Sequence, residues 1–137
     1  MALLDVNALV ALAWNRHVHH LAITAWFDER PDRAWATCAM TEAGFVRVSS
    51  NPVALGAAVA VETARSVLRG MRDVGGHRFL GNDVSMTDDD VPRVGGHRRV
   101  TDAVLLTVAR RHGVEVVTFD AGLADLARGD GVALLRA

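Results

Sequence analysis

The segment from residue 98 to residue 123, RRVTDAVLLTVARRHGVEVVTFDAGL, constrains the fold of this chain more than any other. Apolar residues recur at helical spacing after Asp102, and Gly113 ends the helix. Residues 114–119 are mostly apolar and β-branched, which is typical of a strand covered on both faces of an α/β sheet. Asp120 follows this strand directly. It is therefore expected at the carboxyl end of a buried strand, where the active sites of open α/β sheets form.

The same order of strand, acid and helix occurs twice more. The chain opens with an apolar strand over residues 1–6, which carries Asp5 near its end, and a helix follows. A second short strand over residues 34–38 leads into a helix over residues 40–50, with Glu42 in its first turn. Repeated units of this kind predict an α/β fold, a mainly parallel sheet with helices on both faces. The other predicted elements are strands over 77–80 and 132–135 and helices over 7–14, 19–30, 55–74 and 121–127.

Two expectations concern the starts of helices. Thr101 is predicted to be the N-cap of a helix that begins at Asp102, because its hydroxyl can accept a hydrogen bond from a free amide of the first turn. Thr87 is predicted to cap a short surface helix whose first turn holds the three acids at 88–90. Adjacent residues of a helix point in different directions, so these three acids are not expected to bind a metal ion together.

The composition limits the class of protein. A chain of 137 residues, with 50% hydrophobic residues and a net charge of −1, has room for one globular domain and is neither disordered nor strongly basic. Cys38 is the only cysteine, so no internal disulfide can form, which suits a reducing compartment. The sequence has neither an apolar run long enough to span a membrane nor an export signal. We therefore expect one domain over residues 1–137, located in the cytoplasm.

Four acids lie at predicted junctions between a strand and a helix: Asp5, Glu42, Asp102 and Asp120. The strand ends of a parallel sheet open on one edge, so these carboxylates are expected to converge there. Carboxylates held close together repel one another and raise one another's pKa. A hard divalent cation such as Mg²⁺ or Mn²⁺ removes that repulsion and prefers oxygen ligands. The pattern therefore favours metal-dependent phosphodiester cleavage.

Four blocks of the sequence resemble the motifs of PIN-domain nucleases, in particular the VapC-type ribonuclease toxins of bacterial toxin–antitoxin pairs. They are LLDVNALVAL, the pair Thr37 and Glu42, VTDAVLLTVARRHG and VVTFDAGL. The resemblance covers nearly the whole chain, with the blocks in the same order. It implies a three-layer α/β/α fold, selective RNA cleavage, homodimerisation, and inhibition by a small cognate antitoxin.

Carried onto this sequence, the resemblance makes the catalytic and metal-binding acids Asp5, Glu42, Asp102 and Asp120, and the supporting polar residues Asn7 and Thr118. Many relatives carry an additional acid close to the last two of these acids. The nearest candidate here is Asp125, about one helical turn beyond Asp120. This departure leaves open whether one metal ion or two would bind.

Cationic residues are expected to contact RNA near the acids. His97, Arg98 and Arg99 lie in a glycine-rich segment just before Asp102, and we expect them to contact phosphate groups. A second group shares one helix face, which is either ordinary solvated surface or a further RNA contact: Arg65, Arg69 and Arg72. The histidines at 17, 19 and 20 offer no pair at i, i+4 and no cysteine partner, so solvated loop side chains are favoured over a metal site.

These features predict an endoribonuclease toxin that uses Mg²⁺ or Mn²⁺ to cleave cellular RNA, whether tRNA, rRNA or mRNA. The alternative is a non-catalytic RNA-binding or regulatory protein with the same fold. A phosphatase or a receiver-like protein is a third hypothesis, but it would need a nucleophilic aspartate beside a lysine. All fifteen basic residues of this chain are arginine, which disfavours that hypothesis.

Overall fold

A five-stranded sheet forms the centre of the molecule. The computed structural model describes residues 1–55 and 59–136, and in it the strands lie in the order β3-β2-β1-β4-β5, with every pairing parallel. The strands are β1 (Ala2–Leu4), β2 (Ala34–Cys38), β3 (Gly76–Leu80), β4 (Glu115–Thr118) and β5 (Val132–Leu134).

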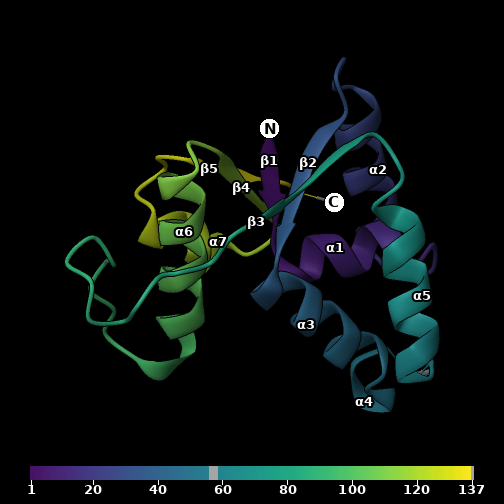
Figure 1. Ribbon diagram of the computed structural model, residues 1–137, viewed down its shortest axis with the longest axis horizontal. Coiled ribbons are helices and arrows are strands. Elements are labelled where there is room, and N and C mark those ends of the chain that lie inside the picture. The colour runs from purple at the N-terminus through teal and green to yellow at the C-terminus, as the bar shows by residue number, and fades with distance from the viewer. Residues whose placement is uncertain (56–58, 137) are drawn as a thin grey trace.

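Helices cover both faces of this sheet, so the predicted three-layer α/β/α fold is confirmed (Figure 1). One face carries α1 (Val6–Ala13), α2 (His20–Asp28), α3 (Ala39–Ser49) and α5 (Val61–Met71). The other face carries α6 (Val100–Arg111) and α7 (Ala121–Leu126). The remaining helical segments are the short α4 (Pro52–Leu55) and the single 3₁₀ turn η1 (His97–Arg99). Among the described residues, no helix has both the length and the apolar character needed to cross a bilayer.

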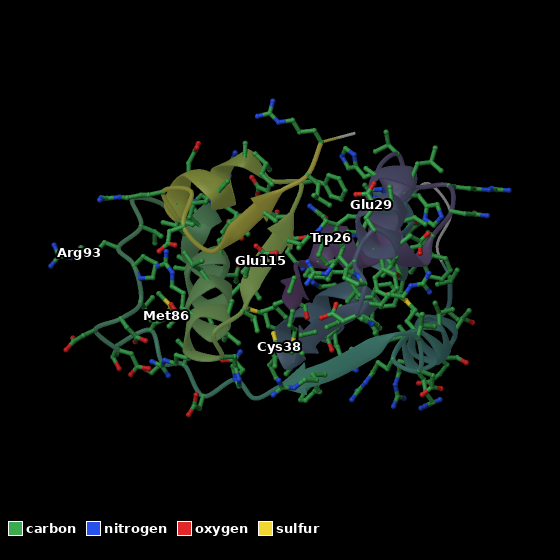
Figure 2. All side chains as sticks on the ribbon, turned by 90° about the horizontal axis from the view of Figure 1, so that it is seen from above. Trp26, Glu29, Cys38, Met86, Arg93 and Glu115 are labelled. Atoms are coloured by element: carbon green, nitrogen blue, oxygen red, sulfur yellow. The ribbon has the colours of Figure 1, made fainter. Side chains whose placement is uncertain are left out.

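Two separate hydrophobic cores follow from the alternation of side chains along the central strands. In β1, Leu4 packs with α1 and α3 on one face, while Leu3 packs with α6 on the other. In β2, Trp35 belongs to the first core and Cys38 to the second. All four side chains are buried, and Cys38 is seen inside the molecule in Figure 2. The central strands are therefore apolar on both faces, as their composition predicted.

The chain changes direction across the sheet between β1 and β4. From β1 it builds outward through β2 and β3, and it then returns to the other side of β1 to form β4 and β5. In this pairing Leu4 lies opposite Val117, and the amide of Asp5 donates to the carbonyl of Val117 at 3.1 Å. The carboxyl ends of two strands that are far apart in sequence therefore meet at the switch point where open α/β sheets place their binding sites.

Some predicted boundaries and caps are wrong. Helix α6 begins at Val100 with Arg99 in the cap position, so Thr101 lies inside the helix instead of capping it. The helix predicted over 55–74 falls partly on residues 56–58, outside the described residues, and within the described part α5 spans only Val61–Met71.

The acids at 88–90 do not start a helix. The residues around them form turns, and the guanidinium of Arg111 holds two of their carboxylates, each at 2.8 Å: Asp88 and Asp90. Arg111 is in the last turn of α6, so this long connection is fixed to the end of that helix. The labelled Met86 and Arg93 lie on the same outer connection in Figure 2.

A close approach of two helices fixes one wall of the switch point. A Cβ atom added at Gly44 in α3 would overlap the side chain of Val6 at the start of α1. Trp14, just after α1, stacks on Phe45, and its indole nitrogen donates to Ser49 at 2.9 Å. Glycine at position 44 therefore lets α3 pack directly against α1.

We expect Gly44→Ala to destabilise the protein by about 1–3 kcal/mol, because the added methyl overpacks the contact with Val6. The matched control is Gly70→Ala in α5, where an added Cβ meets no atom within 4 Å. That change should stabilise the protein by about 0.5–1 kcal/mol through helix propensity. Urea denaturation of both variants measures the two effects, and equal free energies of unfolding would contradict the close approach.

Candidate active site

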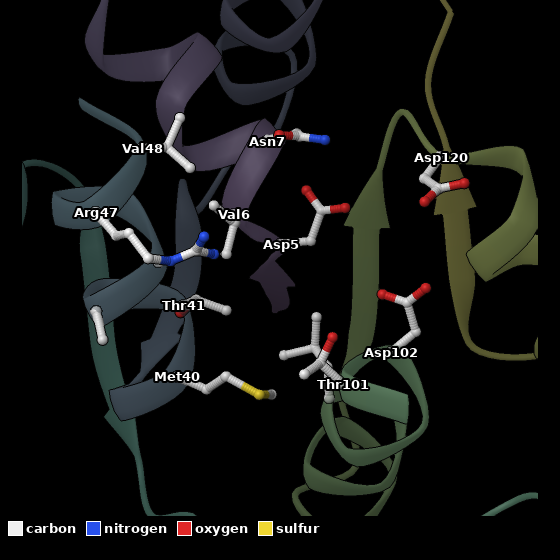
Figure 3. A pocket seen from close by; sticks show the side chains of 13 residues that line it. Asp5, Val6, Asn7, Met40, Thr41, Arg47, Val48, Thr101, Asp102 and Asp120 are labelled. Atoms are coloured by element: carbon white, nitrogen blue, oxygen red, sulfur yellow. The ribbon is translucent and has the colours of Figure 1, made fainter. Parts of the chain in front are cut away.

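A cavity of about 480 Å³ opens at the switch point of the sheet. Its acidic side chains come from three separate elements: Asp5 follows β1, Asp120 follows β4, and Asp102 is in the first turn of α6. Figure 3 shows the three carboxylates turned toward one another across this space. The opposite wall is formed by α3, from which Met40 and Arg47 reach the cavity. Three of the four predicted acids are therefore brought together.

Asp5 is the buried member of the three, with 8% of its surface exposed. Its Oδ1 accepts the amide of Ala8 at 2.8 Å, which makes it the N-cap of α1. Its Oδ2 accepts the hydroxyl of Thr118. The pKa of Asp5 is raised to about 6, chiefly by burial. The hydrogen bonds from Thr118 and Ala8 oppose this rise, and the charges of Asp102 and Asp120 add to it. A full negative charge on this carboxylate is therefore costly in the protein as it stands.

Asp120 is also a helix cap, but it has a cationic partner. Its Oδ1 accepts the amide of Gly122 at 2.8 Å, and its own amide donates to the Thr118 hydroxyl at 2.9 Å. The Arg99 guanidinium donates to Oδ2 of Asp120 and to Oδ2 of Asp102, each at 2.8 Å. Burial alone would raise the pKa of Asp120, but the hydrogen bonds from Arg99 and Gly122 outweigh it and lower the pKa.

Glu42 does not join this group, so the predicted convergence of four acids is wrong for this residue. Its Oε2 accepts the hydroxyl of Thr37 at 2.5 Å and lies 3.4 Å from Nη1 of Arg72. Thr37 also contacts Nε2 of His77 at 2.8 Å. Glu42 borders a different cavity, of about 320 Å³, together with the arginines predicted to share a helix face: Arg65, Arg69 and Arg72.

The periodicity of α3 explains the position of Glu42. At 100° per residue, the positions that line the acidic cavity fall on one side of the helix. These positions are Met40, Thr41, Ala43, Gly44, Arg47 and Val48. Glu42 falls on the opposite side and is directed toward α5. An acid in the first turn of a helix is therefore near the strand end, but its side chain need not face it.

The other predicted residues occupy different positions around the cavity. Asn7 lines it and is exposed, and Thr118 hydrogen-bonds to both Asp5 and Asp120. His97 and Arg98 are exposed on η1 and are not among the residues that line the cavity.

Asp125, the candidate for an additional acid, is exposed on α7 and does not line the cavity either. The predicted phosphate contact of Arg99 has a competitor, because its guanidinium is held by two carboxylates.

Sequence reasoning missed Arg47 and Gly44, which line the cavity from α3. The spacing of Thr41, Gly44 and Val48 at i, i+3 and i+7 marks one helix face and could have identified this wall.

The donor atoms of the cavity suit a hard divalent cation. Asp5, Asp102 and Asp120 offer carboxylate oxygens, which Mg²⁺ and Mn²⁺ prefer, and a bound cation would offset the repulsion from Asp102 and Asp120 that contributes to the raised pKa of Asp5. Within residues 1–55 and 59–136, no three acidic, histidine or cysteine side chains are already close enough to coordinate one ion. The three carboxylates therefore fit such an ion by chemistry, after a change in their side-chain positions.

Comparison with known proteins identifies the family. The sequence matches the PIN domain family over residues 2–129. It is 62% identical over 128 residues to ribonuclease VapC38 of Mycobacterium tuberculosis, which covers 93% of this chain and 91% of that protein. It is 44% identical over 137 residues to ribonuclease VapC39 of the same species, which covers 98% of this chain and 99% of that protein.

A solved structure shares the fold. The crystal structure of M. tuberculosis VapC20, a toxin that cleaves the sarcin–ricin loop, matches with a TM-score of 0.66 and covers 99% of this chain and 100% of that one. The two sequences are 13% identical, so this likeness concerns the fold alone. The matches in sequence carry the assignment further: the chain belongs to the PIN-domain family and, within it, to the VapC-type ribonucleases.

Proposed function

We propose that this protein is a divalent-metal-dependent endoribonuclease that acts as the toxin of a toxin–antitoxin pair. The observation that carries the proposal is the cavity at the switch point, where carboxylates from three separate elements meet: Asp5, Asp102 and Asp120. The ribonuclease names of relatives that are 62% and 44% identical support RNA as the substrate. The reaction is cleavage of a phosphodiester bond in cellular RNA.

Asp5, Asp102 and Asp120 are the residues that would hold Mg²⁺ or Mn²⁺. When bound, such an ion supplies positive charge that activates water and stabilises charge on the phosphate oxygens. The Ala8 amide and the Thr118 hydroxyl each donate to one oxygen of Asp5 and so orient its carboxylate. Glu42 is left out of the set, since Thr37 and Arg72 engage its carboxylate elsewhere.

The rest of the cavity supplies contacts for RNA. Asn7 and Arg47 border the acids and can contact the sugar–phosphate backbone. His97 and Arg98, exposed on η1 just before α6, can approach the same strand from the side of Asp102. The net charge of the chain is −1, so affinity for RNA has to come from such local groups and not from the charge of the whole molecule.

The proposed partners follow from the toxin assignment. We propose that the protein acts in the cytoplasm, that it forms a homodimer, and that a cognate antitoxin protein inhibits it by covering the acidic cavity. The names of the relatives support this class of protein, and the single buried cysteine suits a reducing compartment.

Asp5→Asn should lower the rate of RNA cleavage by about 100-fold or more, since even residues that only orient metal ligands cost about 10–100-fold. The control is Asp125→Asn, the same chemical change at an exposed acid outside the cavity, which should keep its activity. Cleavage of labelled RNA in Mn²⁺ and in EDTA measures both variants. Full activity of Asp5→Asn, or of the unaltered protein in EDTA, would contradict the proposal. If the unaltered protein binds the RNA but does not cleave it with any divalent ion, the non-catalytic alternative is favoured instead.

The acidic cluster should also affect stability in the absence of metal. The pKa of Asp5 is about 6 in the folded protein, against about 3.9 in an unfolded chain. The folded state therefore binds the proton more tightly, and its stability falls as the pH rises from about 4 to about 6. The amide introduced by Asp5→Asn has no proton to lose in this range. This variant should therefore be more stable than the unaltered protein above about pH 6, by up to about 3 kcal/mol.

Thermal melts in EDTA test this expectation. At about pH 7.5 the midpoint of Asp5→Asn should lie a few degrees higher, and at about pH 4 the two midpoints should coincide. Asp125→Asn is again the control. Its midpoint should differ from that of the unaltered protein by the same amount at both pH values. An unaltered protein as stable as Asp5→Asn at the higher pH would show that the buried carboxylate carries no such cost.

A further inference from the structure

Arg99 places a positive charge between two of the proposed metal ligands. One atom, Nη1, lies 2.8 Å from Oδ2 of Asp102 and 2.8 Å from Oδ2 of Asp120. These two acids come from α6 and from the end of β4, so the arginine joins elements that no strand pairing connects at this point. Their side chains are 21% and 39% exposed, and that of Arg99 is 37% exposed. The cationic group is thus partly exposed to solvent beside the cavity, which Asp102 and Asp120 line and Arg99 does not.

The position of the guanidinium is built into the surrounding backbone. Arg99 ends the 3₁₀ turn η1 and is the N-cap residue of α6, three residues before Asp102, so its side chain lies on the same side of the chain as that acid. Gly122, in the first turn of α7, provides the space on the other side. A Cβ atom added at Gly122 would overlap the Arg99 guanidinium, and no other group lies nearer to it. A residue without a side chain at this position is what allows the arginine to lie against Asp120.

A divalent ion bound between the Oδ2 atoms of Asp102 and Asp120 would compete with the Arg99 guanidinium. The Arg99 nitrogen already lies at hydrogen-bond distance from both oxygens, and two cations held on the same pair of carboxylates repel each other. In the part of the chain that the structure describes, no set of three ligands is arranged around a common point. Carboxylates spaced around a guanidinium are farther apart than the oxygen ligands of Mg²⁺ or Mn²⁺, which lie close around the ion.

We propose that Arg99 is a tethered cation that neutralises Asp102 and Asp120 in the metal-free protein and has to leave before a divalent ion binds both. Arg99 is thus a positioning residue that sets the metal affinity of the site, and Gly122 provides the space that holds it there. The proposal rests on the proposed function, because it takes these acids as metal ligands. It predicts that loosening the arginine tightens the binding of metal.

The test is a titration with Mn²⁺ alone, in which electron paramagnetic resonance measures the free Mn²⁺. It compares the unaltered protein with three variants. Arg99→Gln removes the competing charge. Gly122→Ala keeps every charge and displaces the guanidinium, which can move because it is the far end of a flexible side chain. Arg98→Gln removes the same charge one residue away and is the control, since this side chain is exposed and outside the cavity.

Arg99→Gln and Gly122→Ala should both bind Mn²⁺ more tightly than the unaltered protein, by about 3- to 10-fold for two partly exposed contacts. Arg98→Gln should stay within about 2-fold, a difference below that of one such contact. Melting curves show whether Gly122→Ala folds, and Arg99→Gln tests the proposal independently of it.

Other outcomes separate the two proposals. If Arg99→Gln binds Mn²⁺ as tightly as the unaltered protein or more weakly, the proposed competition between Arg99 and the metal ion is overturned. The proposal of a metal-dependent nuclease is not affected by that result. If Arg98→Gln gains as much affinity for Mn²⁺ as Arg99→Gln, the loss of one positive charge near the site explains the gain. That result also overturns the proposed role of Arg99. If Gly122→Ala folds and binds like the unaltered protein, the space at Gly122 does not hold the arginine in place. No Mn²⁺ binding by any of the four proteins overturns the metal site as well.

Discussion

The parallel pairing of β1 with β4 is the interaction on which the site depends. Leu4 lies opposite Val117, and the next amide along, that of Asp5, still bonds to the Val117 carbonyl. Two acids from opposite ends of the sequence, Asp5 and Asp120, are therefore brought to one edge of the sheet by main-chain hydrogen bonds. Because this register is set by strands that are apolar on both faces, the site is as fixed as the hydrophobic cores beside it.

Electrostatics explain why each acid has a particular set of donors. Asp5 and Asp120 both cap helices, so backbone amides at the positive ends of α1 and α7 stabilise their charge. For Asp120, these amides together with Arg99 outweigh the effect of burial, and its pKa is lowered. For Asp5, burial outweighs the hydrogen bonds, and its pKa is raised. The site thus keeps one carboxylate whose charged form is disfavoured by burial.

The course of the main chain could be predicted from the sequence. Buried strands are recognisable as apolar β-branched runs and helices by their periodicity, and the topology rules for parallel sheets then bring Asp5, Asp102 and Asp120 together. What the sequence does not contain is the rotation of each helix about its axis. For α3 that rotation depends on contact between Gly44 and Val6, so a rule based on distance from a strand end misplaced Glu42. The cap of α6 failed for a related reason, because η1 adds a turn before Thr101.

Arg99 shows where such reasoning ends. A basic residue beside acids in the sequence is equally consistent with binding a phosphate of the substrate and with neutralising the acids themselves. Composition does not separate these roles, because the difference lies in a small space beside α7, where Gly122 leaves room for a guanidinium. Asp5 and Asp120 each accept a hydrogen bond from a main-chain amide, whereas the Arg99 guanidinium is held by its two ion pairs. In the proposed site the fold sets where the carboxylates lie, and the long cationic side chain is the part that a metal ion would displace.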